Sequence, residues 1–209
     1  MIRVVPFASC YIYSPQGRCP VSDRSRLMLA LLKAVDPTYM VKYAGRVRKE
    51  ASGISALNQF FHARDILVPI PGSAPLSRGV PWVAQHLASA LVGEGLGLRA
   101  WAGIRRAWPV RKSSAAPAGA RPSVARHYDS FAVEPCDQAP DRIVLIDDVV
   151  TKGRTLLAAA TRMHEAYPSA DIRAFALVRT MGLVAEIERL IEPVRGEIRW
   201  RAGDAQRSP

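Results

Sequence analysis

The sequence predicts an α/β fold, an open and mainly parallel sheet flanked by helices, with a helical region before it. From residue 65 onward, short apolar runs alternate with segments of helical period, and strands that alternate with helices favour a parallel sheet with right-handed crossovers. Residues 143–146 are apolar without interruption and are followed by acid. Such a run is typical of a central parallel strand that is covered on both faces.

The length of 209 residues favours one domain. We divide the chain into a helical region over residues 1–62, the alternating core over 63–195 and a tail over 196–209. The chain has only three cysteines, an odd and sparse set that favours a reducing compartment. Its first residues lack the pattern of a secretory signal, and the apolar run at 27–35 is too short to cross a bilayer. We therefore expect a cytoplasmic protein.

The N-terminal third is expected to be mostly helical. Residues 24–35 place apolar side chains on one helical face, and Pro37 ends that helix. Residues 46–61 are a second candidate helix, with Gly53 as a weak point. A strand over residues 65–71 follows and is stopped by a Pro-Gly turn. Residues 81–91 then return to helical spacing.

The remaining elements continue the alternation up to the tail. Residues 98–104 indicate a strand, and residues 111–126 indicate a long loop because they have no apolar period. The central strand spans residues 142–147, and the helix that follows begins at Gly153 and reaches about His164. We expect a further strand over residues 172–178, a closing helix over 184–191 and a frayed end over 202–209.

The positive charge of the chain indicates an anionic partner. Twenty-nine Lys and Arg residues face 18 Asp and Glu residues, a net charge of +11, which suits nucleic acid, acidic lipid or a small phosphorylated ligand. Residues 95–128 contain no acid. Their basic residues are Arg99, Arg105, Arg106, Arg111, Lys112, Arg121 and Arg126. This segment is either an anion site or contact surface, or a solvated basic loop.

The segment with the clearest chemistry follows the central strand. Asp147 and Asp148 stand where a buried strand reaches the carboxyl edge of the sheet, the edge at which open α/β folds bind ligands. The turn after them runs into a helix N terminus, whose unpaired amides and dipole favour an anion. Its residues are Thr151, Lys152, Gly153, Arg154 and Thr155. Glycine lets the backbone come close to a ligand, and threonine hydroxyls can donate to phosphate oxygens.

Two carboxylates would repel a simple phosphate, so they need another partner on the same ligand. Vicinal hydroxyls are suitable donors, and Mg²⁺ can be shared between them and Asp147 or Asp148. A sugar with a terminal phosphate satisfies both halves of the motif. The alternative, in which one acid caps a turn and Gly153 starts a helix, leaves the second acid and the Thr-Lys-Gly-Arg-Thr order unexplained.

Residues 147–155 resemble the phosphoribosyl pyrophosphate (PRPP) signature of type I phosphoribosyltransferases. The resemblance implies that Asp147 and Asp148 contact the ribose hydroxyls and that residues 151–155 hold the 5′-phosphate. Lys152 stands where the family often has Thr or Ser. In this family an N-terminal hood covers the site, a role that the resemblance gives to residues 1–62.

Weaker similarities extend toward the ComF branch, which relates to competence for DNA uptake. They are the Lys-Tyr-x-Gly segment at 42–46, the proline-rich strand end at 68–71, the Arg-Gly at 78–79 and a flexible loop within 112–131. The chain lacks the four-cysteine zinc module of many ComF proteins, and it lacks a glutaminase domain.

The resemblance also assigns two further groups. The first is a pyrophosphate loop of Pro71, Gly72 and Ser73 together with Arg78, which either grips the diphosphate or faces solvent. The second is a catalytic pair on a closing loop, Arg111 and Lys112. Arg121, Arg126 and His127 are weaker candidates, since a lone histidine in a basic loop is more often structural or solvated. Trp101 and Trp108 either stack on a base or belong to the core.

The expected function is phosphoribosyl transfer that uses Mg²⁺ and PRPP. A nitrogen nucleophile, for example a nucleobase, would be the acceptor or donor, with exchange of pyrophosphate. Two alternatives stay open: a non-catalytic module that senses PRPP or a nucleotide, and a competence-type protein that binds single-stranded DNA. Dimers are frequent in the family, and the sequence does not identify the acceptor or the oligomeric state.

Overall fold

The computed structural model describes residues 1–77, 79–111, 121–182, 184 and 186–209. Its large sheet consists of β1 Val4–Tyr13, β2 Ile66–Pro69, β3 Arg99–Ala100, β6 Arg142–Val150, β7 Asp171–Thr180, β8 Ile191–Arg201 and β9 Asp204–Ser208. Two short strands, β4 Ile104–Arg106 and β5 Phe131–Val133, form a separate antiparallel pair. The helices are α1 Pro20–Lys33, α2 Pro37–Ser52, α3 Val83–Gly93, α4 Val124–Ser130 and α5 Arg154–Ala166.

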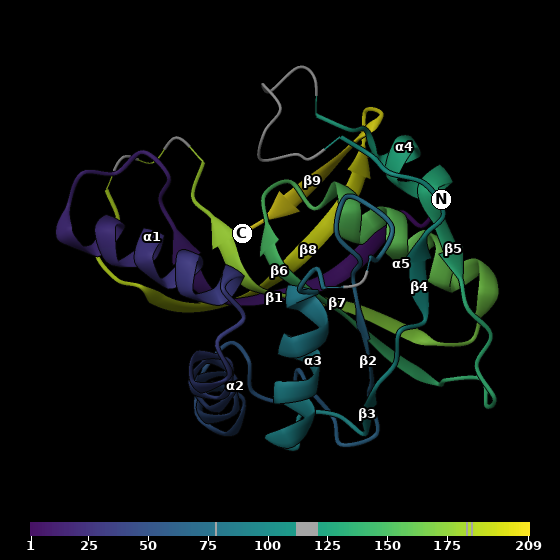
Figure 1. Cartoon of the computed structure of the whole chain (residues 1–209), viewed down its shortest axis with the longest axis horizontal. Coiled ribbons are helices and arrows are strands. Elements are labelled where there is room, and N and C mark those ends of the chain that lie inside the picture. The colour runs from purple at the N-terminus through teal and green to yellow at the C-terminus, as the bar shows by residue number, and fades with distance from the viewer. Residues whose placement is uncertain (78, 112–120, 183, 185) are drawn as a thin grey trace.

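The strand order of the large sheet is β3-β2-β6-β7-β1-β8-β9 (Figure 1). All pairs from β3 to β1 are parallel, whereas β8 and β9 are added in antiparallel pairs at the other edge. The predicted class, α/β with a mainly parallel sheet flanked by helices, is confirmed. No helix in the described ranges is long and apolar enough to cross a membrane.

The central strand β6 is covered on both faces, as its unbroken apolar run predicts. Ile143 and Leu145 belong to one core cluster, which includes the buried residues of α5. Val144 and Ile146 belong to the other cluster, which includes buried residues of α1, α2 and α3. Each buried side chain of this kind contributes about 1.5–3 kcal/mol relative to exposure. This burial explains why an uninterrupted apolar strand forms here.

The ends of β2 and β6 lie at a topological switch point. After β2 the chain crosses through α3 to β3, and after β6 it crosses through α5 to β7, in the opposite direction along the sheet. The two crossover helices cover opposite faces (Figure 1). Crevices of this kind are where open α/β sheets bind ligands. The fold therefore places the loop after β2 and the turn after β6 around one crevice.

The expectation of a mostly helical N-terminal third is wrong for its first residues. The strand β1 lies inside the sheet, parallel to β7 and antiparallel to β8. It is buried on both faces, so its apolar run has no period of two, and such a run cannot be distinguished from a buried helix by pattern alone.

The predicted helix over residues 46–61 is also wrong in its bounds. The helix α2 begins at Pro37, and Asp36 caps it by accepting from the backbone N–H of Thr38 at 2.8 Å. Proline suits the first helical position because a backbone N–H there would have no intrahelical partner, so its absence costs no hydrogen bond. Pro37 therefore starts α2, and the helix ends at Ser52, before Gly53.

The strand predicted over residues 172–178 is confirmed as part of β7, Asp171–Thr180, but the predictions for residues 184–191 and 202–209 are wrong. The described residues between 184 and 190 form no helix, and Ile191 begins β8. The end expected to be frayed forms β9, which pairs with β8. The segment at 98–104 is split into β3 and the start of β4, and α4 begins within the predicted loop. Strands with many charged residues carry little apolar alternation, and this explains why β8 and the edge strand β9 were missed.

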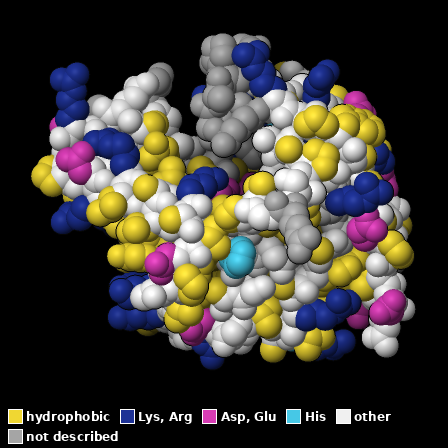
Figure 2. Space-filling view, in the orientation of Figure 1, with side chains coloured by type: hydrophobic (Ala, Val, Ile, Leu, Met, Phe, Trp, Pro, Cys, Tyr) yellow, Lys and Arg dark blue, Asp and Glu magenta, His cyan; other side chains and the backbone are white. Residues whose placement is uncertain are grey.

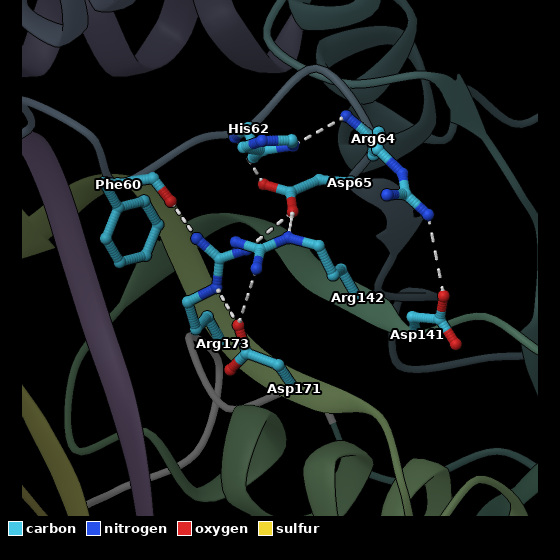
Figure 3. A network of polar contacts seen from close by, with 8 residues as sticks. All are labelled: Phe60, His62, Arg64, Asp65, Asp141, Arg142, Asp171 and Arg173. Carbon is cyan, nitrogen blue, oxygen red and sulfur yellow. Dashed lines mark hydrogen bonds and ion pairs between the residues drawn. The ribbon is translucent and has the colours of Figure 1, made fainter.

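A buried charge network joins the amino ends of β2, β6 and β7 (Figure 3). Asp65 is fully buried, and its Oδ1 accepts from Arg142 Nε at 2.9 Å and from Arg173 Nη2 at 2.6 Å. Its Oδ2 accepts from the backbone N–H of His62 at 2.7 Å. Arg173 also donates to the carbonyl of Phe60. The acid is thus fully compensated at the end of the sheet opposite to the crevice.

Replacement of Asp65 by Asn leaves two arginines without their buried counter-charge. We expect Asp65→Asn to lower the free energy of unfolding by about 3 kcal/mol or more, measured by urea denaturation. Asp141→Asn is the control, because Asp141 is exposed and its ion pair with Arg64 spans 3.8 Å. This control should change stability by less than about 0.5 kcal/mol. Equal losses in the two variants would contradict the structural role of the network.

Candidate functional site

The acidic pair lies in the second half of β6, which continues to Val150 beyond the predicted end. Asp147 Oδ1 accepts from the backbone N–H of Asp148 at 2.9 Å, and Asp148 Oδ1 accepts from that of Val149 at 2.8 Å. Asp148 is also ion-paired with Lys33, the last residue of α1. The N-terminal helical region thus supplies a cation to the pair.

Asp147 is held in an environment that disfavours its charge. Burial raises the pKa of its carboxyl well above the usual range, and the neighbouring charge of Asp148 raises it further, while Lys33 acts in the opposite direction. The ionised form of such an acid is stabilised most when hydroxyl groups or a cation approach it. The environment of Asp147 therefore suits a ligand that brings donors to the pair.

The turn after β6 depends on the backbone of Gly153. This residue has φ 86° and ψ 15° and is the N-cap of α5. A Cβ atom at this position would lie 2.8 Å from side-chain atoms of Ile198 in β8. Glycine is therefore required both by the left-handed backbone and by the close approach. Because glycine has no side chain to cap α5, the first-turn amides are left for water or a ligand.

A cavity of about 160 Å³ opens at this turn. It is lined by Arg121, His127, Asp147, Val149, Val150, Thr151, Lys152, Gly153, Arg154, Thr155 and Leu156. Six of the seven residues predicted for PRPP binding, all except Asp148, therefore border one space. Figure 2 shows that the face is hollowed beside α1, and that Lys and Arg side chains are spread over several elements rather than gathered in one patch.

Two of the predicted phosphate ligands are engaged by the C-terminal hairpin. Asp204 Oδ2 accepts from Arg154 Nη2 at 2.7 Å and lies 3.2 Å from Lys152 Nζ. The hydrogen bond from Arg154 lowers the pKa of Asp204 to about 2. Arg154 also donates to the carbonyl of Pro122 at 3.2 Å. These contacts fix the turn between β9 and the segment that precedes α4.

The two threonines of the turn differ in what holds their hydroxyl protons. Thr180 donates its one hydroxyl proton to the carbonyl of Val150 at 2.8 Å, so Thr151 is the donor in the 3.0 Å contact between the Thr151 and Thr180 hydroxyls. Arg207 Nε donates to the carbonyl of Thr151 at 2.9 Å and holds the backbone from behind. Thr155 Oγ1 lies 3.5 Å from His127 Nε2.

A buried arginine connects this turn to the predicted pyrophosphate loop. Arg106 donates to the carbonyl of Gly72 at 2.9 Å, to His127 Nδ1 at 2.9 Å and to the hydroxyl of Ser130. Burial lowers its pKa to about 10, so it stays cationic at neutral pH. Burial and the charges of Arg106 and Arg154 lower the pKa of His127 to about 4. The imidazole is therefore neutral at neutral pH.

The loop after β2 is held by backbone contacts. Pro71 is buried and Gly72 is exposed, and the carbonyl of Ser73 accepts from the N–H of Val110 at 2.7 Å. Arg111, the next residue, is exposed. The predictions for Arg78 and Lys112 lie outside the described residues. The structure thus joins the loop at 71–73 to the segment that leads toward the predicted closing loop.

The acidic pair fits a Mg²⁺ ion that is held mainly by a ligand. Within the described ranges, no group of three or more His, Cys, Asp or Glu residues could hold a metal. Mg²⁺ commonly uses one or two protein carboxylates and completes its shell with substrate phosphates and water. Asp147 and Asp148 would hold it in this way.

Sequence reasoning missed most of the supporting residues. Lys33, Asp204 and Arg207 come from elements remote in sequence, and Arg106 was noted only as one of several basic residues. His127 was ranked low, and no local pattern identifies it. Of the two tryptophans, Trp101 packs edge-on against Tyr167 with ring centroids 5.9 Å apart, whereas Trp108 is half exposed. Trp101 therefore belongs with the core residues.

No protein-family model and no curated protein matches this chain.

The close approach of β8 to the turn predicts the effect of a methyl group at Gly153. Gly153→Ala should lower the free energy of unfolding by about 3 kcal/mol, from left-handed strain together with overpacking against Ile198. The matched control is Gly203→Ala, because Gly203 has φ 81° and no atom within 4 Å of an added Cβ. That variant should lose only about 1 kcal/mol. Urea denaturation measures both, and equal losses would contradict the role of the contact.

Proposed function

We propose that the protein is a type I phosphoribosyltransferase-like protein of the ComF-like branch that binds PRPP and Mg²⁺. Its reaction is transfer of the phosphoribosyl group to or from a nitrogen nucleophile, such as a nucleobase, with exchange of pyrophosphate. One observation carries this proposal. One cavity at the switch point is bordered both by a partly buried acid with a raised pKa and by an uncapped helix N terminus behind a left-handed glycine.

Each half of the cavity suits one part of the ligand. Asp147 and Asp148 accept hydrogen bonds from the ribose hydroxyls, and the amides of the 151–155 turn receive the 5′-phosphate. The hydroxyl of Thr155 adds a donor to the phosphate, and Thr151 adds a second when its proton turns from Thr180 to the ligand. Lys152 and Arg154 contribute positive charge while Asp204 holds them in place.

The diphosphate end belongs on the other side of the switch point. The loop of Pro71, Gly72 and Ser73 follows β2, the parallel neighbour of β6, and Arg106 links it to His127, so we assign this loop and Arg78 to the diphosphate. Bound Mg²⁺ would offset charge on the departing diphosphate. Arg111 and Lys112 stabilise charge that develops as the bond to the anomeric carbon breaks, and closure of their segment excludes water.

The N-terminal region acts as the hood in this proposal. Lys33, at the end of α1, already reaches Asp148. A ribose that binds the acidic pair would therefore lie beside α1. We therefore assign the acceptor to the space next to the N-terminal helices, in keeping with the variable hood that the resemblance implies.

The test is binding of PRPP in the presence of Mg²⁺, measured by isothermal titration calorimetry. The double variant Asp147→Asn/Asp148→Asn keeps the shape of both side chains and removes their charge. We expect affinity to fall about 100-fold or more, because two hydrogen bonds to charged acceptors are lost. The matched control is Asp137→Asn/Asp141→Asn, which makes the same change in net charge at two exposed acids and should bind PRPP like the unaltered protein.

Turnover separates the enzyme from a sensing module. The unaltered protein should release pyrophosphate from PRPP in a Mg²⁺-dependent reaction with at least one member of a panel of nucleobases. PRPP binding without turnover would favour the non-catalytic alternative. Undetectable PRPP binding, or equal affinity in the two double variants, would contradict the proposal. Single-stranded DNA binding that weakens steeply with salt would instead favour the competence-type alternative.

A further inference from the structure

The side chain of His127 is buried and yet borders the cavity. Only 3% of the residue is exposed, and it is one of the residues that line the space in front of the 151–155 turn. Its Nε2 atom points to Thr155 Oγ1 at 3.5 Å. Thr155 is in the first turn of α5, so the ring edge faces the same space as the uncapped helix amides.

The tautomer of His127 is fixed by its other neighbour. Arg106 Nη2 lies 2.9 Å from Nδ1. A guanidinium group can only donate hydrogen bonds, so Nδ1 must be the acceptor. The low pKa of the ring keeps it neutral, and a neutral imidazole has one N–H. That hydrogen is therefore on Nε2, on the cavity side.

This Nε2–H is poorly satisfied by the protein. Its partner at 3.5 Å lies beyond the usual N–H···O range of about 2.7–3.2 Å. Buried polar hydrogens are normally paired at shorter distances, so this long contact leaves room for a better acceptor on the cavity side. The helix N terminus next to it favours an anion as that acceptor.

We propose that the Nε2–H of His127 donates a hydrogen bond to the terminal phosphate of the ligand that the 151–155 turn holds. This inference rests on the proposed function and adds a neutral donor from α4 to the amides of α5 and the hydroxyl of Thr155. It also gives Arg106 a role as a positioning residue. By donating to both Gly72 and His127, Arg106 aligns the donor with the loop on the other side of the crevice.

Two substitutions of His127 distinguish its two roles. One role is donation to the ligand by Nε2–H, and the other is acceptance of a hydrogen bond from Arg106 by Nδ1. The amide nitrogen of Gln takes the place of Nε2, so His127→Gln keeps the donor that faces the cavity. The amide oxygen of Asn takes the place of Nδ1, so His127→Asn keeps the acceptor for Arg106 and loses the cavity donor. A purely structural histidine would tolerate Asn better than Gln.

Affinity for PRPP and for ribose 5-phosphate is measured by calorimetry in the three proteins, after thermal unfolding has shown that each is folded. We expect His127→Asn to weaken both ligands about tenfold or more, and His127→Gln to recover most of that loss. The reverse order, or two variants that both bind like the unaltered protein, would overturn the inference. If the unaltered protein binds neither ligand, the proposed function fails together with the inference.

A second measurement uses the unaltered protein, so it tests the inference even if one of the His127 variants does not fold. In ¹⁵N-labelled protein, the Nε2–H resonance of His127 should move downfield when ribose 5-phosphate is added. Shifts of the amides of residues 151–155 without any shift of this resonance would overturn the inference and leave the proposed function intact.

Discussion

The contact between Gly153 and Ile198 is the constraint on which the candidate site depends. The turn after β6 must be tight enough for α5 to begin four residues beyond the strand, and β8 packs against it at a distance that excludes a Cβ atom. In the same hairpin, Asp204 binds the side chain of Arg154 and Arg207 donates to the backbone carbonyl of Thr151, so both hold the turn in place. The antiparallel edge of the sheet thus shapes the end of its central parallel strand.

The two ends of the sheet differ in how completely their charged and polar groups are paired. At the amino end, both carboxylate oxygens of Asp65 are matched, by two arginines and a backbone N–H. At the carboxyl end, Asp147 is held with a raised pKa and His127 has only a distant partner. Fully compensated charge stabilises a fold, whereas incompletely compensated groups that converge on a cavity are typical of ligand sites.

The part of the structure that could be predicted from sequence is local. The order of β6, the turn and α5 follows from an apolar run, adjacent acids and a glycine within 25 residues, and the α/β class follows from the alternation of elements. The strand β1 could not be recognised because burial on both faces removes the period that identifies a strand. The hairpin β8–β9 was missed because its many charged residues leave little apolar alternation.

The site was predictable to the same extent. Residues of the 151–155 turn are adjacent in sequence, and the cavity brings them together. His127 of α4 and Asp204 of β9 contact the turn, Lys33 of α1 contacts Asp148, and Arg106 of β4 contacts His127. Only the tertiary structure determines which basic or acidic residue comes close. Interactions between distant segments have no periodic signal, so His127 could not be distinguished from a solvated histidine.

The central claim is that the crossing from β6 to α5 binds a sugar diol through acids and a phosphate through amide hydrogens. A crystal structure of the protein with PRPP and Mg²⁺ tests it most directly. The account predicts the 5′-phosphate within hydrogen-bonding distance of the amides of residues 151–155 and the ribose hydroxyls at Asp147 and Asp148. A phosphate bound elsewhere, with this turn empty at a PRPP concentration that saturates binding in solution, would contradict it.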